Sequence, residues 1–474
     1  MQRQTKIVAT LGPATDDPQM LAAVLRAGVD VVRLNFSHGD AEEHQRRAEA
    51  VHRTARGLGR QVAVLGDLQG PKIRIASFRE GAITLLPGRS FVLDPDLPEL
   101  DGSEEGVGLV YRDLYRDVRA GDVLLLDDGR MELEVEAVIG RVIRCRVRIG
   151  GVLTGHKGVN RRGGGLSAPA LTRKDRQDIE LAARIGVDYL AVSFVKTEDD
   201  LNEARGLLLE AGHDAAVVAK IERSEAVSNI TGIMWASDAV MVARGDLGVE
   251  IGDAALAGVQ KDILRRAGEL DCVVITATQM METMVERPMP TRAEVLDVAN
   301  AVLDGTDAVM LSAETAVGRY PLQVVESMDR ICRGAEAHWA AQPLRTPEQE
   351  FERVDEAIAK SAVYAANHFR IKAIAALTES GASAMWISRV RSRLPLYAIT
   401  ASESTARRVA LYRGVHPVLM EGSASERGER QALARLLADG AVSRGDLVMF
   451  TLGDQAGLPG ATNTMKILRA GLGG

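Results

Sequence analysis

Three charged residues in the middle of the chain have the types and spacing that metal-assisted phosphate chemistry needs. Lys220-Ile221-Glu222 places an ammonium and a carboxylate two residues apart at the end of a β-branched run, and Asp246 ends the next such run. Alternate residues of a strand point to one face, so Lys220 and Glu222 are expected on the same side. Mg²⁺ takes one or two protein carboxylates and fills its other positions with water and substrate oxygens. Glu222 and Asp246 are therefore the candidate Mg²⁺ ligands.

Cations near these carboxylates indicate a bound phosphate. Arg33 lies in another run, Arg33–Ser37, and Arg74 follows a run that ends at Asp67. Guanidinium groups bind phosphate oxygens through paired hydrogen bonds. Without a pair of nucleophile and base, such a set is suited to positioning a phosphoryl group in transit and stabilising its charge. The alternative for any single pair is a structural ion pair buried in the fold.

Several common motifs are absent. The chain has no GxxxxGK[ST] loop and no GxGxxG fingerprint, which excludes P-loop enzymes and the dinucleotide-binding motif. None of its eight histidines has metal-ligand spacing. Only His38 is expected near the site, whereas His44 and His52 are expected on the solvated face of a polar helix.

Eight β-branched runs carry these residues, and amphipathic helical segments usually follow them. Nearly continuous apolar strands are typical of a parallel sheet buried on both faces. Eight βα units predict an α/β fold of the (βα)8 TIM-barrel type, with its site at the carboxyl ends of the strands. The expected strands are Lys6–Gly12, Asp30–Ser37, Val62–Leu68, Tyr189–Val195, Ala216–Glu222, Ala239–Asp246, Val273–Gln279 and Ala308–Glu314.

Two other parts interrupt or follow the barrel pattern. Residues 70–167 consist of short strand-like runs and tight turns, which predict an inserted small β-barrel that acts as a lid, or alternatively a fixed decoration. Near the end, helical and strand-like segments alternate up to Asp446–Leu452, which predicts an open α/β domain. The expected domains are 1–69 and 168–345 for the barrel, 70–167 for the lid and 346–474 for the C-terminal domain.

Composition restricts the possible partners and compartment. The net charge is −7 with acids and bases interspersed, which argues against nucleic acid as the main partner. Three distant cysteines without a CxxC pair indicate a reducing compartment. We find no signal-peptide pattern and no apolar run long enough to cross a bilayer. These observations predict a cytoplasmic protein that does not bind membranes.

The chain resembles the pyruvate kinase family from its first strand almost to its C-terminus. The matching stretches are Lys6–Ala14, Arg33–Gly39, Gly66–Arg74, Lys157–Asn160, Lys220–Glu222, Met241–Gly248, Ala277–Met280 and Met310–Thr315. The resemblance implies transfer of a phosphoryl group from phosphoenolpyruvate to ADP, giving pyruvate and ATP in the last step of glycolysis. The run Arg161–Ala168 resembles a bacterial branch of the family that looks independent of potassium.

The resemblance also implies roles for individual residues. Glu222 and Asp246 would bind the catalytic Mg²⁺. Lys220 would stabilise the phosphoryl group in flight, and Arg33 would contact the substrate phosphate. The backbone at Gly245 and Asp246 would hold the substrate carboxylate together with Thr278. The enolate would be protonated near two hydroxyls, those of Thr278 and Ser312.

Further positions match the nucleotide and cation sites of the family. The implied nucleotide contacts are Arg74, Lys157, His38 and Asn35. The implied monovalent-cation site comprises Asn35, Ser37 and Asp67. The threonine, lysine and glutamate common in potassium-dependent members are replaced by Leu68, Gln69 and Lys72. The Lys72 ammonium would supply the missing charge, so we expect that Mg²⁺ is required and K⁺ is not.

The resemblance extends to regulation and assembly. The inserted domain would close over the nucleotide and exclude water, and the C-terminal domain would be regulatory. The effector-phosphate loop would comprise Thr378, Ser380, Gly381 and Ser383. Members of the bacterial branch respond to AMP or sugar monophosphates more than to fructose 1,6-bisphosphate, so the resemblance implies an effector of that kind. Glu379 inside this loop fits this expectation, because it would repel a second phosphate. A homotetramer is implied by the family alone.

Two other functions compete with this interpretation. One is a barrel enzyme that uses Mg²⁺ and phosphoenolpyruvate or pyruvate for C–C bond chemistry. Such an enzyme has no need of the lid or of the nucleotide contact at Lys157. The other is a catalytically silent metabolite sensor. Every matched catalytic position is filled in this chain, which argues against such a sensor. Pyruvate release from phosphoenolpyruvate with and without ADP separates the three.

Overall fold

A computed structural model of the chain describes residues 2–340, 351, 353–390, 392–421, 428–453 and 462–471. The chain forms two compact units. The first contains Met1–Asp67, Leu181–Leu190 and Leu264–Gly474, and the second contains Leu68–Glu180 and Ala191–Ile263. The expected boundary between the barrel and the C-terminal domain, at 345/346, lies outside the described residues.

Eight strands form the predicted closed barrel, in the order β1-β16-β15-β14-β13-β12-β3-β2. Neighbouring strands are parallel, as in the pairs β1·β2, β2·β3 and β13·β14. Most strand residues are buried apolar side chains, as expected for a parallel sheet covered on both faces. The strands are β1 Lys6–Thr10, β2 Val31–Asn35, β3 Ala63–Asp67, β12 Tyr189–Val192, β13 Ala216–Ile221, β14 Ala239–Ala243, β15 Val273–Ala277 and β16 Ala308–Leu311.

Helices follow the strands, and several begin at the capping residues that the sequence indicates. The carboxylate of Asp17 accepts the N–H of Met20 at the start of α1, and Asp40 and Thr291 begin capping boxes at α2 and α10. The helices outside the inserted segment and the C-terminal part are α1 Pro18–Ala27, α2 Ala41–Gly57, α4 Arg173–Ile185, α5 Glu198–Glu210, α6 Ser224–Ser228, α7 Ile230–Ala236, α8 Arg244–Ile251, α9 Asp253–Glu269, α10 Arg292–Asp304, α11 Ala313–Ala316 and α12 Pro321–Ala340. Short 3₁₀ turns occur at η1 Pro13–Thr15 and η2 Glu282–Val285.

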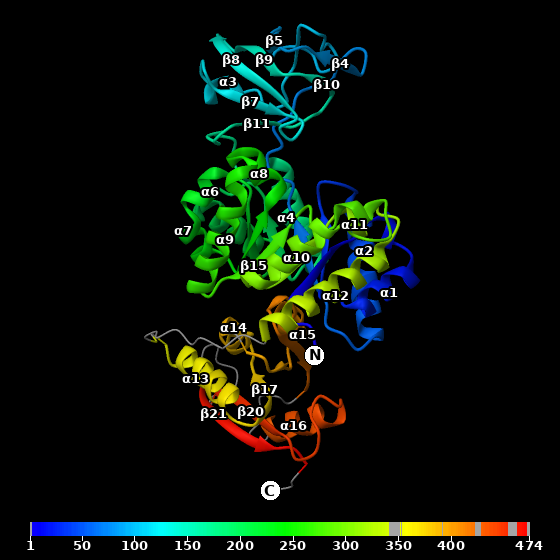
Figure 1. Cartoon of the computed structure of the whole chain (residues 1–474), viewed down its shortest axis with the longest axis vertical. Helices are drawn as coiled ribbons and strands as arrows, with labels where there is room; N and C mark the ends of the chain where they lie inside the picture. Colours follow the sequence, from blue (N-terminus) through cyan, green and yellow to red (C-terminus); the bar gives the residue numbers. More distant parts are fainter. Residues whose placement is uncertain are drawn as a thin grey trace. The chain divides into compact units, whose positions relative to one another are not determined.

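The inserted segment is all-β apart from one short helix, as predicted. Its strands form two sheets around a shared core, and neither sheet closes into the small barrel that was expected. A six-stranded sheet has the order β11-β7-β8-β9-β5-β6, and β10 pairs with β4. Figure 1 shows these strands in blue to cyan. The elements are β4 Ala82–Leu85, β5 Ser90–Leu93, β6 Gly106–Val107, α3 Leu114–Asp117, β7 Val123–Leu126, β8 Met131–Ile139, β9 Val142–Ile149, β10 Gly151–Thr154 and β11 Val159–Arg161.

The C-terminal part is an α/β layer with sheet order β19-β18-β17-β20-β21. Helices α13 and α14 pack in one apolar cluster with the sheet, and α16 packs in a second (Figure 1). The predicted sheet ends at β20 and lacks β21, an antiparallel edge strand with many exposed positions. The elements are α13 Val354–His368, β17 Ile371–Leu377, α14 Ala382–Arg389, β18 Leu396–Thr400, α15 Glu403–Arg408, η3 Val409–Leu411, β19 Val415–Leu419, α16 Gly428–Ala438, β20 Leu447–Gly453 and β21 Thr462–Arg469.

An aspartate precedes every second strand of the barrel and joins it to the strand before. Asp30 precedes β2, and its Oδ2 accepts the N–H of Ile7 in β1 at 3.0 Å, while its own N–H donates to the Ile7 carbonyl. Asp188, Asp238 and Asp307 make the same two bonds to the strands before β12, β14 and β16. We call this arrangement the aspartate clamp. Its partners in the other three cases are Val64, Val217 and Val274.

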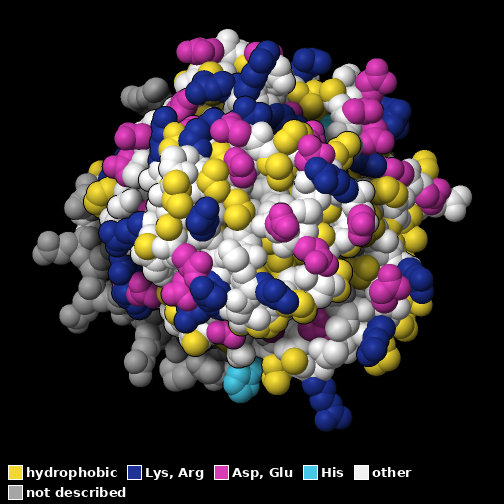
Figure 2. Space-filling view, turned by 90° about the horizontal axis from the view of Figure 1, so that it is seen from above, with side chains coloured by type: hydrophobic (Ala, Val, Ile, Leu, Met, Phe, Trp, Pro, Cys, Tyr) yellow, Lys and Arg dark blue, Asp and Glu magenta, His cyan; other side chains and the backbone are white. Residues whose placement is uncertain are grey.

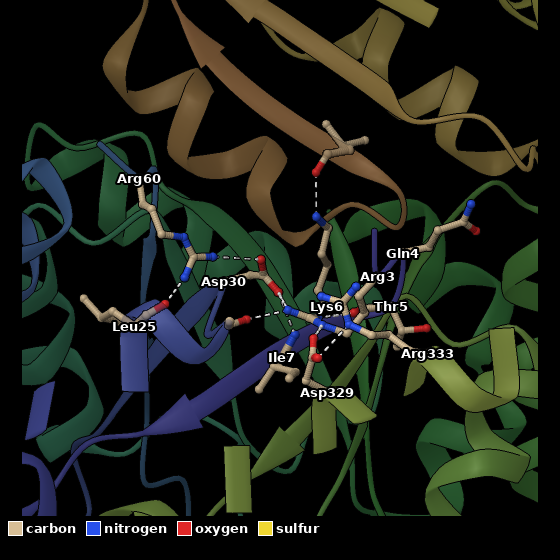
Figure 3. Close-up of polar contacts among 12 residues, drawn as sticks. Arg3, Gln4, Thr5, Lys6, Ile7, Leu25, Asp30, Arg60, Asp329 and Arg333 are labelled. Carbon is tan, nitrogen blue, oxygen red and sulfur yellow. Dashed lines mark hydrogen bonds and ion pairs between the residues drawn. The ribbon is translucent and has the colours of Figure 1, made fainter. Parts of the chain in front are cut away.

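Three of the four clamp aspartates are buried, and cations neutralise them. Asp30 lies between Arg3 at 3.0 Å and Arg60 at 3.5 Å, as Figure 3 shows. The C-terminal part supplies the cations of the other two, because Arg407 Nε lies 2.9 Å from Asp188 and Arg389 Nη1 lies 2.9 Å from Asp307. A buried ion pair costs stability when one partner is removed. The C-terminal part therefore helps to neutralise the starts of β12 and β16.

Lys6 adds an unusual group to this region. It is the first residue of β1, and its ammonium donates to the carbonyl of Val415 in β19 at 2.5 Å. Burial lowers the pKa of Lys6 to about 8, although Asp30 opposes that shift. The folded state therefore favours the neutral amine more than the unfolded chain does.

The depressed pKa predicts how stability depends on pH. An unfolded lysine keeps a pKa of about 10.4. Between about pH 8 and pH 10 the unfolded chain then binds more protons, and the contribution of Lys6 to stability rises with pH. Lys6→Met should remove this contribution, so the melting temperature of the variant relative to the parent should be higher at pH 7 than at pH 9.5. A fall of the Lys6 pKa from about 10.4 to about 8 corresponds to on the order of 3 kcal/mol in the free energy of unfolding, gained over the whole range between these two pKa values.

The matched control is Lys372→Met, which changes an exposed lysine on β17. The melting temperature of this variant relative to the parent should be the same at pH 7 and at pH 9.5. If Lys6→Met and its parent differ by the same amount at both pH values, the buried ammonium does not titrate as described.

Candidate functional site

The second unit contains the cluster that the sequence analysis placed at the centre of the site. Lys220 and Glu222 come from the end of β13, and Lys220 Nζ lies 2.8 Å from Glu222 Oε1. Both side chains are largely buried. Glu222 Oε2 also accepts the backbone N–H of Phe194 at 2.7 Å. The expected juxtaposition of this ammonium and this carboxylate is confirmed.

Asp246 reaches this cluster from a helix and not from a strand. The predicted strand Ala239–Asp246 is wrong beyond Ala243, because Arg244 begins α8 and Asp246 stands in its first turn. A carboxylate is favourable there, since the first turn exposes unpaired N–H groups and the positive end of the helix dipole. The other predicted strands also run beyond the observed ones, because polar turns and short helices begin at their carboxyl ends.

The neighbouring carboxylates of Glu222 and Asp246 favour a cation between them. Burial and the charge of Glu222 together raise the pKa of Asp246 to about 6, against the opposing charge of Lys220. Two carboxylates near each other repel when both are ionised. A divalent cation between them would relieve this repulsion, so the residues present fit an oxygen-bound metal. No cluster of three or more metal-binding side chains occurs among the described residues, and Mg²⁺ does not need one.

Lys72 and Arg74 border the same cluster. Burial lowers the pKa of Lys72, and the neighbouring charges of Arg74 and Lys220 act in the same direction. Lys72 is half-buried and interacts with the charges of Asp246 and Glu222. Lys72 therefore lies beside the cluster and is not directed wholly to solvent.

Arg74 and Lys157 lie on paired segments at the base of the inserted domain. Arg74 forms an isolated antiparallel bridge with Gly158, and the N–H of Ile75 donates to the carbonyl of Lys157 at 3.0 Å. The Lys157 ammonium lies 2.7 Å from Asp127. The chain therefore brings the two predicted nucleotide cations close along the backbone, with Lys157 paired to an acid of the inserted domain.

The first unit holds the remaining predicted residues of β2 and β3. Arg33 Nε donates to Asp67 at 2.6 Å, and Arg33 Nη1 donates to the Thr10 hydroxyl at 3.0 Å. The amide of Asn35 lies 3.2 Å from His38 Nδ1, and its oxygen accepts the N–H of Ser37. These bonds form two polar groups, Arg33 with Asp67 and Asn35 with Ser37 and His38. β2 ends at Asn35, so Ser37 lies in the turn after the strand and not on the predicted strand face.

One histidine was placed wrongly from the sequence. His44 was expected on a solvated helix face, yet it is buried. Its ring stands edge-on to Phe36 with centroids 4.9 Å apart, and its Nε2 lies 2.9 Å from the His38 carbonyl. The helix is polar by composition, but this position faces the turn after β2.

Thr278 and Ser312 follow β15 and β16 in irregular backbone. Thr278 and Gln279 have φ angles of 66° and 54°, in the left-handed region that non-glycine residues seldom adopt. The N–H of Ser312 donates to Glu314 at 2.6 Å, and Glu314 also accepts the N–H of Met281. Burial raises the pKa of Glu314. Glu314 is thus a bridge between the two turns, which sequence reasoning did not identify.

Ser193 is the other residue that sequence reasoning missed. Its hydroxyl lies 2.6 Å from Lys220 Nζ. The signal was present in the chain, because Ser193 is the one small polar residue in the run Tyr189–Val195.

The predicted effector loop joins β17 to α14. The Thr378 hydroxyl accepts the N–H of Gly381 at 2.9 Å, and the Ser380 hydroxyl accepts the N–H of Ala382. Ser383 is buried, and its hydroxyl contacts Thr462 of β21. The Glu379 side chain is exposed, while its carbonyl accepts from Thr405.

The surface carries charged side chains of both signs. On the face that Figure 2 shows, cationic and anionic side chains are interspersed without a large field of one sign. No helix in the described part of the chain combines the length and the apolar character that crossing a bilayer requires.

Comparisons with known proteins cover nearly the whole chain. Residues 2–325 match the family model described as "Pyruvate kinase, barrel domain", and residues 356–468 match "Pyruvate kinase, alpha/beta domain". Pyruvate kinase II of Salmonella typhimurium is 54% identical over 472 residues, which are 98% of this chain and 98% of that protein. Pyruvate kinase of Haemophilus influenzae is 52% identical over 98% of this chain and 97% of the relative. A crystal structure of a pyruvate kinase from Cryptosporidium parvum superposes with a TM-score of 0.92 at 33% identity, covering 99% of this chain and 96% of that one.

The buried pair of Arg33 and Asp67 gives a testable consequence. Asp67→Ala leaves the Arg33 guanidinium without its carboxylate and should cost roughly 3 kcal/mol. The double variant Arg33→Met/Asp67→Ala removes both charges and should melt at a higher temperature than Asp67→Ala alone. Thermal unfolding followed by circular dichroism measures both.

Asp101→Ala is the control, because Asp101 pairs with Arg79 at 3.3 Å in an exposed position. Exposed pairs contribute about 1 kcal/mol or less, so this variant should melt close to the parent. A double variant no more stable than Asp67→Ala would mean that the buried guanidinium is satisfied without Asp67.

Proposed function

The chain belongs to the pyruvate kinase family, whose reaction transfers a phosphoryl group from phosphoenolpyruvate to ADP, and we propose that Glu222 and Asp246 hold the Mg²⁺ of that reaction. Bound Mg²⁺ supplies charge neutralisation for the phosphoryl oxygens. The observation that carries the proposal is the Lys220, Glu222 and Asp246 cluster, in which the pKa of Asp246 is raised by burial and by Glu222. An oxygen-binding dication at this point would favour the charged form of Asp246.

The cations around this cluster would gather two anionic substrates. Lys220 stabilises the phosphoryl group in flight, because its ammonium is fixed and poorly hydrated before the group arrives. Arg33, oriented by Asp67 and Thr10, binds the phosphate of phosphoenolpyruvate. The N–H groups of Gly245 and Asp246 open α8, and such helix starts bind anions. Together with Thr278 they hold the substrate carboxylate.

The remaining assignments concern the enolate and the nucleotide. Thr278 and Ser312 lie on the route by which the enolate gains its proton. Arg74 and Lys157 bind ADP, and the polar group of Asn35 and His38 borders the nucleotide. Lys157 would exchange its partner Asp127 for a phosphate when ADP binds. The inserted domain then acts as a lid that excludes water from the transferred phosphoryl group.

Lys72 takes the place of a monovalent cation in this proposal. Asn35, Ser37 and Asp67 match the cation site of the family, but Lys72 brings a covalently attached ammonium to the cluster, where Asp246 and Glu222 favour its charged form. One unit charge at ~5 Å and an effective dielectric of ~20 contributes about 3 kcal/mol, or about a hundredfold in rate when it favours the transition state. Leu68 is buried and offers no hydroxyl to an ion.

Regulation and assembly complete the proposal. The loop Thr378–Ser383 would bind the phosphate of AMP or of a sugar monophosphate through its hydroxyls and backbone amides. The exposed Glu379 disfavours a ligand with a second phosphate. The protein would work in the cytoplasm as a homotetramer.

Lys220→Met tests the central assignment. Lys220 acts on charge that develops in the transition state, so the loss should appear in kcat and leave KM for phosphoenolpyruvate within about threefold. A loss of roughly 3–4 kcal/mol corresponds to a kcat at least several hundredfold lower. Pyruvate release from phosphoenolpyruvate, assayed with and without ADP, measures the effect. Near-normal kcat in this variant would remove Lys220 from the mechanism.

Activity without potassium tests the role of Lys72. The enzyme should be fully active with Mg²⁺ in a tetramethylammonium buffer, and KCl at constant ionic strength should raise kcat less than about tenfold. Lys72→Glu should lower kcat in that buffer, and added K⁺ should recover part of it through Asn35, Ser37 and Asp67. The comparison variant is Lys72→Gln, which removes the charge without supplying a carboxylate for K⁺. Strong and specific activation of the parent enzyme by K⁺ would contradict the assignment.

A further inference from the structure

The hydroxyl of Ser193 occupies a defined position between a carbonyl and an ammonium. Ser193 directly follows β12 and is 1% exposed. Its Oγ lies 2.7 Å from the carbonyl oxygen of Leu68 and 2.6 Å from Lys220 Nζ. An ammonium only donates and a carbonyl only accepts. The Ser193 hydroxyl must therefore donate to Leu68 and accept from Lys220, which fixes its direction.

Lys220 is consequently held from two sides. Its ammonium donates to Ser193 at 2.6 Å and lies 2.8 Å from Glu222, with only 11% of the side chain exposed. A lysine stem has several rotatable bonds and gains freedom when a partner is lost. Without the hydroxyl, the ammonium would be drawn toward Glu222, away from the direction that Ser193 defines.

Phe194, which follows Ser193, holds Glu222, the other partner of Lys220. Phe194 has a φ of 56°, an uncommon conformation for an aromatic residue, and in it the Phe194 N–H donates to Glu222 at 2.7 Å. Arg223 lies over the Phe194 ring at 5.5 Å. Strained backbone of this kind persists where the surroundings hold it and is often found at functional sites. One dipeptide thus contacts both charged residues of the cluster.

The turn also packs against the segment that leads into the inserted domain. A Cβ atom added to Gly70 would lie 2.8 Å from Ser193 Cβ and 2.8 Å from the Phe194 ring. Gly70 follows Leu68, whose carbonyl accepts from Ser193 and whose N–H donates to Ala191 at 3.0 Å. The hydroxyl of Ser193 therefore links Lys220 to the first residues after β3.

We propose that Ser193 is a positioning residue for phosphoryl transfer, whose hydroxyl holds the Lys220 ammonium in register against the carbonyl of Leu68. The inference rests on the proposed role of Lys220. It assigns to Ser193 no contact with substrate and no proton transfer. Its effect is expected on the rate of the chemical step, since the position of Lys220 matters most when charge develops.

Ser193→Ala removes the hydroxyl and little else. We expect kcat to fall by about tenfold to a hundredfold while KM for phosphoenolpyruvate stays within about threefold. Because Glu222 is held by the Phe194 N–H, Mn²⁺ binding to the substrate-free protein should stay within about twofold of the parent. Ser193→Thr keeps the hydroxyl and should recover at least about fivefold of the lost kcat. Ser228→Ala, an exposed serine of α6, is the control and should be neutral.

Two results would overturn the proposal. The first is Ser193→Ala with kcat within about twofold of the parent. The second is Ser193→Ala slowing the Lys220→Met variant by the same factor as it slows the parent, because a residue acting through Lys220 has nothing left to position. Should the methyl group of threonine unfold the Thr variant, these two comparisons decide alone. Failure of the proposed function is distinguishable, because Lys220→Met itself would then retain its kcat.

Discussion

The aspartate clamp is the interaction on which the rest of the barrel depends. A parallel barrel must bring eight strands into one register while every backbone N–H at its amino end finds an acceptor. Asp30, Asp188 and Asp307 solve this within the first unit, since each carboxylate continues the ladder beyond the last backbone pair. Asp238 does the same in the second unit. The cations beside them lower the cost of holding carboxylates there, and the C-terminal part provides two of these cations, Arg407 and Arg389.

Securing the strands at their amino ends leaves the carboxyl ends free to carry chemistry. There the chain leaves strand geometry early, with Asp246 on a helix and Thr278 in left-handed backbone. These conformations cost energy and would weaken a sheet that relied on its last residues. The polar cluster of Lys220 and Glu222 is likewise held by bonds from the turn after β12 and not by the ladder itself.

Apolar periodicity was enough to predict eight strands, the inserted β segment and the C-terminal α/β layer, because buried parallel strands leave a strong signal. It failed where local structure depends on tertiary contacts. Nothing in the run ending at Asp246 shows that Arg244 begins a helix, and β21 is an exposed edge strand with weak alternation. Charged site residues were found because charge at a strand end is conspicuous. Ser193 was overlooked because a lone serine is not, and its significance appears only through its contact with Lys220.

The attachment of the C-terminal part also has a mechanical meaning. Its bonds to the barrel include three at the starts of strands: β19 at Lys6, Arg407 at Asp188 and Arg389 at Asp307. These places belong to three different strands of one closed ring, and three points on a ring never lie on one line. A rigid body fixed at three such points has no axis left about which it can swivel. Any rotation of the C-terminal part must therefore break a charged or buried bond or turn the strand starts with it.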